Sequence, residues 1–430
     1  MKKNVIKIAT YNAKLILNGW GLTHLKKVRY KKREKKFSSP LPFTKLTLWL
    51  LPSIAISSDR AFNIINIEQG ASRGISIDKE ISMRYYQCKH PFVCGVDIHS
   101  KMIYLCIIDK NKNILLHRPV KNKDTATLTN ILLPYKDKIV VSAESCFPYY
   151  WLADFCKELG IEFQLGHALY MKHIHGGKAK NDRIDSEKIA MLTINQMLPE
   201  AYVYPKEKRH LRDLLRRRLY FVRKRAEIKA HVQIQAYQAN IQETGRISPA
   251  RIQEKTIAPK FENIDQRVSV EMNLSTVDFY DNKISELENY IANRVNSINR
   301  TDVTLLQTIR GIGDIISMTI LLEMDDIHRF KNHKEFASYA RLIKCSHESA
   351  GKKLGFGGSK IGNPYLKYIF GEASVLLPQF NPEIKKYLAR LESKYGKMKS
   401  RAILAHKIGR TVYYMLKNRK VFDLKKFLSS

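Results

Sequence analysis

The chain has 430 residues, enough for two or three domains, and its apolar fraction of 44% is ordinary for a globular protein. Its 75 Lys and Arg residues against 40 Asp and Glu give a formal net charge of +35, which favours a polyanionic partner because neutralised phosphates release counterions. No apolar run approaches the roughly 20 residues that cross a bilayer, so we expect no membrane span. The six cysteines include no C-x-x-C pair, which indicates the reducing cytoplasm and neither structural zinc nor disulfides.

Residues 1–85 differ from the rest of the chain, because basic clusters alternate with isolated apolar stretches and no period is sustained. We interpret them as a basic, poorly ordered extension, or as upstream sequence that is not translated. A basic arm that contacts nucleic acid is the alternative. Met83 is a natural start for a domain that opens on the first clear strand.

An α/β domain is predicted over residues 86–200. A buried strand runs from Phe92 into Asp97, and apolar runs at 102–108 and 114–116 continue it as a meander. The following elements are a short amphipathic segment at 124–133, a strand at 139–143, a helix at 149–159, a strand at 162–165 and a helix after Asp182. Strands with helices between them predict a mixed sheet covered by helices.

Four carboxylates of this domain are placed to converge. Asp97 and Glu144 end predicted strands, while Asp182 and Asp185 are spaced i and i+3 at the start of a helix and so share a face. Converging carboxylates repel one another unless a cation binds, and hard oxygen ligands select Mg²⁺ or Mn²⁺. The alternatives are a solvated turn for Asp97, a salt bridge for Glu144 and a helix N-cap for Asp182. In a chain of this charge we favour the metal site.

Residues 201–300 predict two long helices, which form an antiparallel hairpin or coiled-coil arm around a break at 245–249. Pro205 opens the first helix. Apolar residues recur every seven positions in the first helix at Leu214, Phe221 and Ile228. The second helix shows a cleaner seam at Val277, Tyr280, Ile284, Leu287, Ile291 and Ile298. The first helix is strongly basic, which favours a nucleic-acid face. Its candidate contacts are Arg212, Arg216, Arg217, Arg223 and Lys224.

Residues 301–430 predict a mainly helical domain. A Gly-Ile-Gly turn at 311–313 between two helices lets backbone N–H groups approach a phosphate. Residues 349–363 read as a Gly- and Lys-rich loop, suited to close approach of the backbone to a ligand. The candidate nucleic-acid contacts in these segments are Gly311, Gly313, Lys352, Lys353, Ser359 and Lys360, together with Lys180 of the α/β domain.

Three motifs of the first domain occur in a fixed order: G-V-D at 95–97, A-E at 143–144 and K-N-D-x-x-D at 180–185. Together they resemble the Asp–Glu–Asp–Asp insertion-sequence transposases of the IS110 group, which includes the Piv-type DNA invertases. The second half agrees through G-I-G at 311–313, the segment 336–342, Glu348-Ser349 and Gly362-Asn363. The resemblance covers about residues 92–416.

The resemblance implies a RuvC-like domain of RNase H-type fold, followed by a helical domain with a helix–hairpin–helix and a nucleophilic serine. It implies that Asp97, Glu144, Asp182 and Asp185 bind Mg²⁺ and that a serine attacks DNA to form a 5′-phosphoserine link. We place the nucleophile at Ser349 because Glu348-Ser349 fits the family motif, and Ser359 is the rival. The implied partners are DNA, a noncoding bridge RNA and further copies of the chain in a homo-oligomer.

The sequence departs from the family pattern beside two of these motifs. Ser145, Cys146 and Phe147 follow Glu144, where a small residue, Thr and Gly are usual, and Ala350 stands where Gly commonly follows the serine. The leading hypothesis is an RNA-guided, serine-dependent DNA recombinase. The alternatives are a metal-dependent nuclease of the Holliday-junction resolvase type and an inactive transposase remnant that binds nucleic acid.

Overall fold

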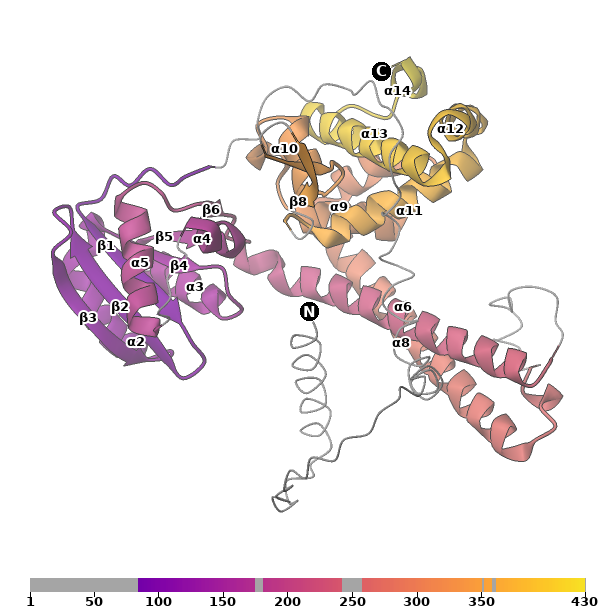
Figure 1. Ribbon diagram of the computed structural model, residues 1–430, viewed down its shortest axis with the longest axis horizontal. Helices are drawn as coiled ribbons and strands as arrows, with labels where there is room; N and C mark the ends of the chain where they lie inside the picture. Colours follow the sequence, from indigo (N-terminus) through magenta and orange to yellow (C-terminus); the bar gives the residue numbers. More distant parts are fainter. Residues whose placement is uncertain (1–83, 175–180, 242–256, 350–351, 358–360, 430) are drawn as a thin grey trace, which may run out of the picture. The chain divides into compact units, whose positions relative to one another are not determined.

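The computed structural model describes residues 84–174, 181–241, 257–349, 352–357 and 361–429 (Figure 1). The predicted extension up to Met83 and the predicted break at 245–249 therefore lie outside the described residues.

A six-stranded mixed sheet forms the first folded region, with the strand order β3-β2-β1-β4-β5-β6. The strands are β1 Phe92–Ile98, β2 Met102–Asp109, β3 Ile114–Lys121, β4 Ile139–Glu144, β5 Glu162–Gly166 and β6 Glu200–Ala201. β1 to β3 form the predicted antiparallel meander, and β4 and β5 continue the sheet parallel to β1. The predicted mixed α/β sheet is confirmed, and the short antiparallel edge strand β6 is an addition to it.

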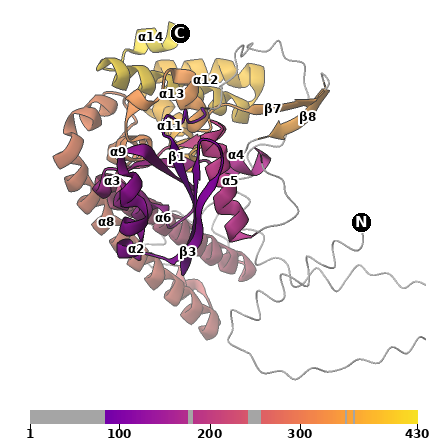
Figure 2. The ribbon, with the colours of Figure 1, turned by 90° about the vertical axis from the view of Figure 1, so that its left-hand side faces the viewer.

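Helices cover both faces of this sheet, with α2 Thr125–Leu132 and α3 Tyr149–Leu159 on one side and α4 Ala168–Ile174 and α5 Asp182–Ile194 on the other (Figure 2). Successive strand residues point to opposite faces. Cys94 therefore packs in the cluster that contains Leu152 of α3, while Val93 packs in the cluster that contains Ile189 of α5. Both faces of β1, β2 and β4 are buried, so these strands read as nearly continuous apolar runs.

Two long helices, α6 Lys206–Gln238 and α8 Ile264–Gln307, pack along each other as the predicted hairpin (Figure 1). Arg218 and Arg225 interrupt the predicted apolar seam of α6. Arg218 forms an ion pair with Glu288 of α8, and Arg225 forms one with Asp281 of α8.

The prediction that Ile298 belongs to the seam is wrong, because its side chain is 48% exposed and Val295 is buried instead. The reason lies one residue further on, where Asn299 leaves the helical conformation with φ −152° and ψ 56°. The helical period of the second seam therefore ends before Asn299.

The C-terminal region is helical, as predicted, and its core includes Phe336, Phe370 and Leu404. Its helices are α9 Asp314–Met324, α10 His333–Tyr339, α11 Pro364–Phe380, α12 Pro382–Tyr395, α13 Lys397–Asn418 and α14 Leu424–Ser429. Short 3-10 turns are η1 Leu133–Lys138, η2 Ala258–Lys260 and η3 Ile327–Arg329.

The loop prediction for residues 349–363 is wrong in part. The antiparallel pair of strands β7 Cys345–Ser349 and β8 Lys352–Gly357 begins before this segment and includes Ser349 and residues 352–357 of it. The many glycines and lysines of this segment are typical of a loop and obscure a short alternating pattern. A strand can still form there, because backbone pairing does not require apolar side chains at every position.

Candidate active site

Asp97 and Glu144 occupy equivalent places on neighbouring parallel strands. β1 and β4 pair with Val96 opposite Ala143, so Asp97 and Glu144 are the next residues of the two strands at the same edge of the sheet. The side chain of Asp97 is only 18% exposed, whereas Glu144 is exposed. The sheet therefore brings together the two carboxylates that sequence reasoning placed at strand ends.

Helix α5 supplies the other two carboxylates from its first turn, with Asp182 and Asp185. Its N-cap is Asn181, whose Oδ1 accepts a hydrogen bond from the Arg183 N–H at 3.1 Å, so the alternative reading of Asp182 as the N-cap is wrong. The Asp182 carboxylate lies 3.3 Å from Nε2 of His99, which follows β1. The Asp185 carboxylate lies 3.4 Å from the Lys188 ammonium.

Gly95 of β1 allows α5 to lie directly on the sheet. A Cβ atom at this position would be 2.2 Å from the Ser186 carbonyl oxygen and 2.4 Å from the Ala190 backbone nitrogen. Both are backbone atoms of α5, which cannot move aside as a flexible side chain would. The close approach brings the first turn of the helix to the strand that carries Asp97.

His99 joins the carboxylates of the two elements. Its Nε2 lies 3.1 Å from Oδ2 of Asp97 and 3.3 Å from Oδ1 of Asp182. One donor atom from each of the three side chains lies within 4.8 Å of the others. Sequence reasoning missed His99, although its spacing of two residues from Asp97 places both side chains on one side of an extended strand.

The electrostatics of the cluster reflect crowded negative charge. Burial raises the pKa of Asp97, His99 opposes that shift, and the carboxylates of Asp182 and Asp185 add to it. Carboxylate oxygens together with an imidazole nitrogen form a donor set that fits a divalent cation, since such an ion offsets the repulsion between the acids.

Ser349 is the last residue of β7, where it pairs with Lys352 of β8, and Glu348 pairs with Lys353. The side chains of this hairpin lie outside the described part of the chain, as do Lys180, Ser359 and Lys360. The structure therefore gives the backbone position of the candidate nucleophile, at the end of a strand of this hairpin.

Arg212 does not face nucleic acid as predicted. Its side chain is buried, its guanidinium carbon lies 3.7 Å from the centre of the Tyr204 ring, and its Nη2 donates a hydrogen bond to the Tyr150 hydroxyl at 2.6 Å. The basic composition of the helix hid this inward position, because a planar guanidinium can stack on aromatic rings in the interior.

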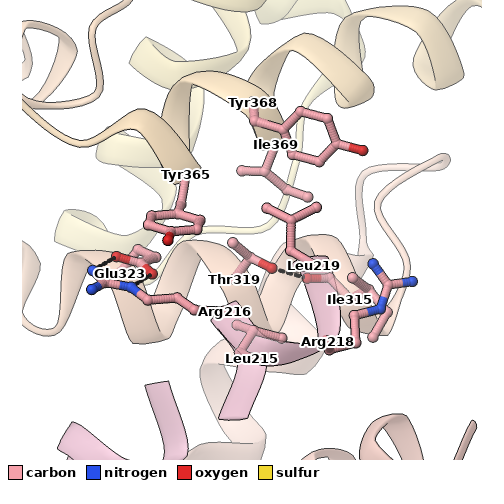
Figure 3. Close-up of a pocket in the computed structure, with 10 residues that line it drawn as sticks. All are labelled: Leu215, Arg216, Arg218, Leu219, Ile315, Thr319, Glu323, Tyr365, Tyr368 and Ile369. Carbon is pink, nitrogen blue, oxygen red and sulfur yellow. Dashed lines mark hydrogen bonds and ion pairs between the residues drawn. The ribbon is translucent and has the colours of Figure 1, made fainter. Parts of the chain in front are cut away.

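Arg216 is likewise engaged within the protein (Figure 3). Its Nε and Nη2 each donate to one carboxylate oxygen of Glu323 at 2.7 Å, and the amide of Asn363 donates to the same carboxylate at 2.7 Å. Asn363 also caps α11, because its Oδ1 accepts from the N–H groups of Tyr365 and Leu366. Glu323 is therefore a buried charge with partners on both sides.

Arg217, Arg223 and Lys224 lie on more exposed positions of α6. Arg217 and Arg223 are exposed, and Lys224 is half-buried and pairs with Glu227 at 2.9 Å. The exposed Tyr220 lies among them. This part of the helix keeps the mixture of cationic and aromatic side chains that suits nucleic acid.

The two glycines of the Gly-Ile-Gly turn differ in their surroundings. Gly311 has φ +103°, and a Cβ there would lie 3.1 Å from Cα of Leu377 in α11, so this glycine serves the packing of the turn. A Cβ at Gly313, which precedes α9, would meet nothing within 4 Å. Of the two, Gly313 leaves the backbone open to a ligand.

The family models and curated proteins to which this chain is similar are transposases. A family model of the DEDD transposase of IS110 elements matches residues 94–237, and one described as the transposase IS116/IS110/IS902 family matches residues 303–389. The chain is 24% identical over 343 residues to the transposase for insertion sequence element IS1111A of Coxiella burnetii, covering 77% of this chain and 91% of that protein. It is 21% identical over 280 residues to a probable family 20 transposase of Pseudomonas aeruginosa, covering 64% and 80% of the two chains.

A six-stranded RNase H-like sheet with acidic residues at one edge, followed by long helices and a helical C-terminal region, defines a DNA-cleaving enzyme of the transposase class. The two family models match successive, non-overlapping parts of the chain. The chain belongs to the IS110 family of DEDD transposases. Among the described residues, no helix has the length and hydropathy that crossing a bilayer requires.

Proposed function

We propose that this transposase cuts and rejoins DNA strands with Mg²⁺ or Mn²⁺ held by Asp97, Glu144, Asp182 and Asp185, and with Ser349 as the nucleophile. The observation that carries the proposal is the approach of Asp97, His99 and Asp182 to one another, with donor atoms within 4.8 Å. The family membership supports the same assignment.

Mg²⁺ bound at this edge would polarise the scissile phosphodiester and stabilise the attacking and leaving oxygens. Asp97, Glu144, Asp182 and Asp185 would hold that ion, and in this proposal the Ser349 hydroxyl attacks the phosphorus of the bound strand. A bond forms between Ser349 Oγ and the phosphorus as the bond to the 3′-oxygen breaks, and the serine proton is transferred so that the strand leaves as a 3′-hydroxyl. One phosphoester replaces another, so the strand can be rejoined by reversal without ATP.

The partners that we propose are DNA, a noncoding guide RNA and other copies of the chain. Arg217, Arg223 and Lys224 on α6 are a reasonable surface for nucleic acid. In the C-terminal region the proposed contacts are Gly313, Lys352, Lys353, Ser359 and Lys360, and in the sheet region Lys180. Ser349 is remote in sequence from the carboxylates, so the two could come from different protomers of an oligomer. An active site shared in this way would require the protomers to assemble before DNA is cut.

Carboxylate variants test the metal assignment. Asp97→Asn, Glu144→Gln, Asp182→Asn and Asp185→Asn should each abolish cleavage of DNA from the element's ends while leaving RNA binding largely intact. Recombination at the wild-type level by Asp97→Asn in Mg²⁺ would remove the metal site from the mechanism.

Serine variants test the nucleophile on a denaturing gel for protein-linked DNA. Ser349→Ala should eliminate the adduct, whereas Ser359→Ala should weaken it only in part. A mixture of the Ser349→Ala and Asp97→Asn proteins should recover some cleavage if protomers share the site. An adduct that persists in Ser349→Ala shows that another residue attacks.

A structure-specific nuclease is the second candidate, because the carboxylate edge alone would suit hydrolysis by water. Such an enzyme would cut branched DNA in Mg²⁺ without any protein-linked product. The presence or absence of the adduct in the wild-type protein therefore separates the two functions.

A further inference from the structure

Phe147 is the most exposed large apolar side chain among the described residues, with 100% of its surface accessible, and Ile264 follows with 70%. A phenyl ring in water contributes nothing to the stability of the fold, and its burial against a ligand is favourable. Single exposed apolar residues are common on protein surfaces, so the place of Phe147 in the fold decides what it can do.

The backbone that carries Phe147 is fixed on both sides. The Ser145 N–H donates to the Gly166 carbonyl at 2.9 Å, and the Ser145 hydroxyl accepts from the Ala168 N–H at 3.2 Å. Pro148 follows directly, which restricts the backbone of Phe147, and α3 begins with the next residue. The ring therefore stands on a preorganised turn, and binding through it costs little ordering of the chain.

This turn adjoins the carboxylate edge. Glu144 ends β4, and the Cys146 N–H donates to its carbonyl at 2.9 Å. Phe147 is the third residue after Glu144, and β4 pairs with β1 so that Asp97 lies on the neighbouring strand at the same edge. The turn that carries Phe147 therefore leaves the sheet where carboxylates from both strands lie.

We infer that Phe147 stacks on a DNA base beside the scissile phosphate and holds that base out of the helical stack. The inference rests on the proposed function, since it takes the phosphate to bind at the carboxylate edge. Aromatic rings stack on any base because every base has a π-face, and apolar wedges inserted at a base step unstack it. An unstacked base next to the cut would expose the phosphate and fix the strand during exchange.

The choice of DNA over a protein surface follows from the neighbours of the ring. The chain carries a net charge of +35, and the carboxylate edge that Glu144 shares with Asp97 is the part of the fold suited to hold a phosphate through a cation. A nucleotide whose phosphate binds there has its base within a few ångströms, which is the distance that a side chain spans.

The test uses the full-length protein and duplex DNA that spans one end of the element. Wild-type cleavage in Mg²⁺ first maps the cut, and 2-aminopurine is then placed at each nucleotide beside it. With Ca²⁺ in place of Mg²⁺ to keep the strand intact, the wild type should raise the fluorescence at one position. Phe147→Ala should lose that rise and cut about five- to a hundredfold more slowly. Phe147→Tyr should retain it.

Phe380→Ala is the matched control, because Phe380 is also exposed, at 55%, and lies at the end of α11. It should behave as the wild type in both measurements. Equal fluorescence of Phe147→Ala and wild type overturns the inference. If the oligomer mass of Phe147→Ala changes while its fluorescence does not, the ring contacts another protein chain, and the inference is again overturned. A wild type that binds but never cuts DNA refutes the proposed function instead, and the wedge with it.

Discussion

Arg216 donates from Nε and Nη2 to the two carboxylate oxygens of Glu323, each at 2.7 Å. The Asn363 amide donates a hydrogen bond to the same carboxylate. Asn363 is also the N-cap of α11. One buried acid therefore connects the long helix α6 to α9 and to the start of α11.

Replacing Glu323 with Ala should destabilise the protein by about 3 kcal/mol, because removal of one partner of a buried pair leaves the other charge without compensation. We expect the lower end of the usual range since Arg216 keeps 31% of its side chain exposed. Urea unfolding followed by circular dichroism measures the change. Glu286→Ala is the control, because its pair with Lys283 is exposed, and it should change stability by less than about 0.5 kcal/mol.

Replacing Gly95 with Ala should destabilise the protein by about 1–3 kcal/mol, because the new methyl group meets the backbone of α5. DNA cleavage should fall more than stability alone explains, since the helix must move away from Asp97. Gly371→Ala, in α11 with no atom within 4 Å of the new Cβ, should instead stabilise by roughly 0.5–1 kcal/mol. Normal cleavage by a stable Gly95→Ala protein would contradict the close packing.

Asp97→Asn should raise the melting temperature in EDTA, because burial and the neighbouring acids disfavour the ionised carboxylate in the folded state. The sign follows from the raised pKa: such a group destabilises the fold above that pKa, and the neutral amide removes this penalty. Added Mg²⁺ should raise the melting temperature of the wild type and leave that of the variant unchanged. A variant that melts lower than the wild type in EDTA would show that the carboxylate is stabilising.

A chain shortened to begin at Met83 should unfold at the same urea concentration as the full chain and bind nucleic acid equally. The described contacts begin with Arg84, which pairs with Glu335, and with the Tyr86 N–H, which donates to the Leu198 carbonyl at 3.0 Å. A chain that begins at Pro91 loses both and should be less stable. Loss of binding on removal of residues 1–82 would assign them a role in the working protein.

The sequence predicts the sheet region well because its elements have sharp limits. The helix predicted at 149–159 is α3 as observed, since Gly160 takes the left-handed conformation at φ +71° and ends it. The placement of Asp97 and Glu144 follows from the two strands alone, because parallel neighbours end at a common edge.

The missed features depend on tertiary contacts that composition does not record. A run of basic residues on a helix does not reveal which ones turn inward, and Arg216 turns inward because Glu323 lies on another helix. His99 belongs to the acidic cluster only because α5 brings Asp182 to it. The strands β7 and β8 are held by backbone pairing, which glycine-rich sequence neither favours nor forbids.

The helical hairpin consists of one continuous helix, α6, and one helix, α8, that is interrupted at Asn299. Asn299 accepts the Asp302 N–H at 3.2 Å and its amide donates to the Asp302 carboxylate at 2.7 Å, so a fresh helical segment starts there. α6 has no such interruption along its 33 residues. We therefore expect α6 to resist bending of the helical hairpin along its whole length. α8 should bend at one place, by rotation of the backbone at Asn299.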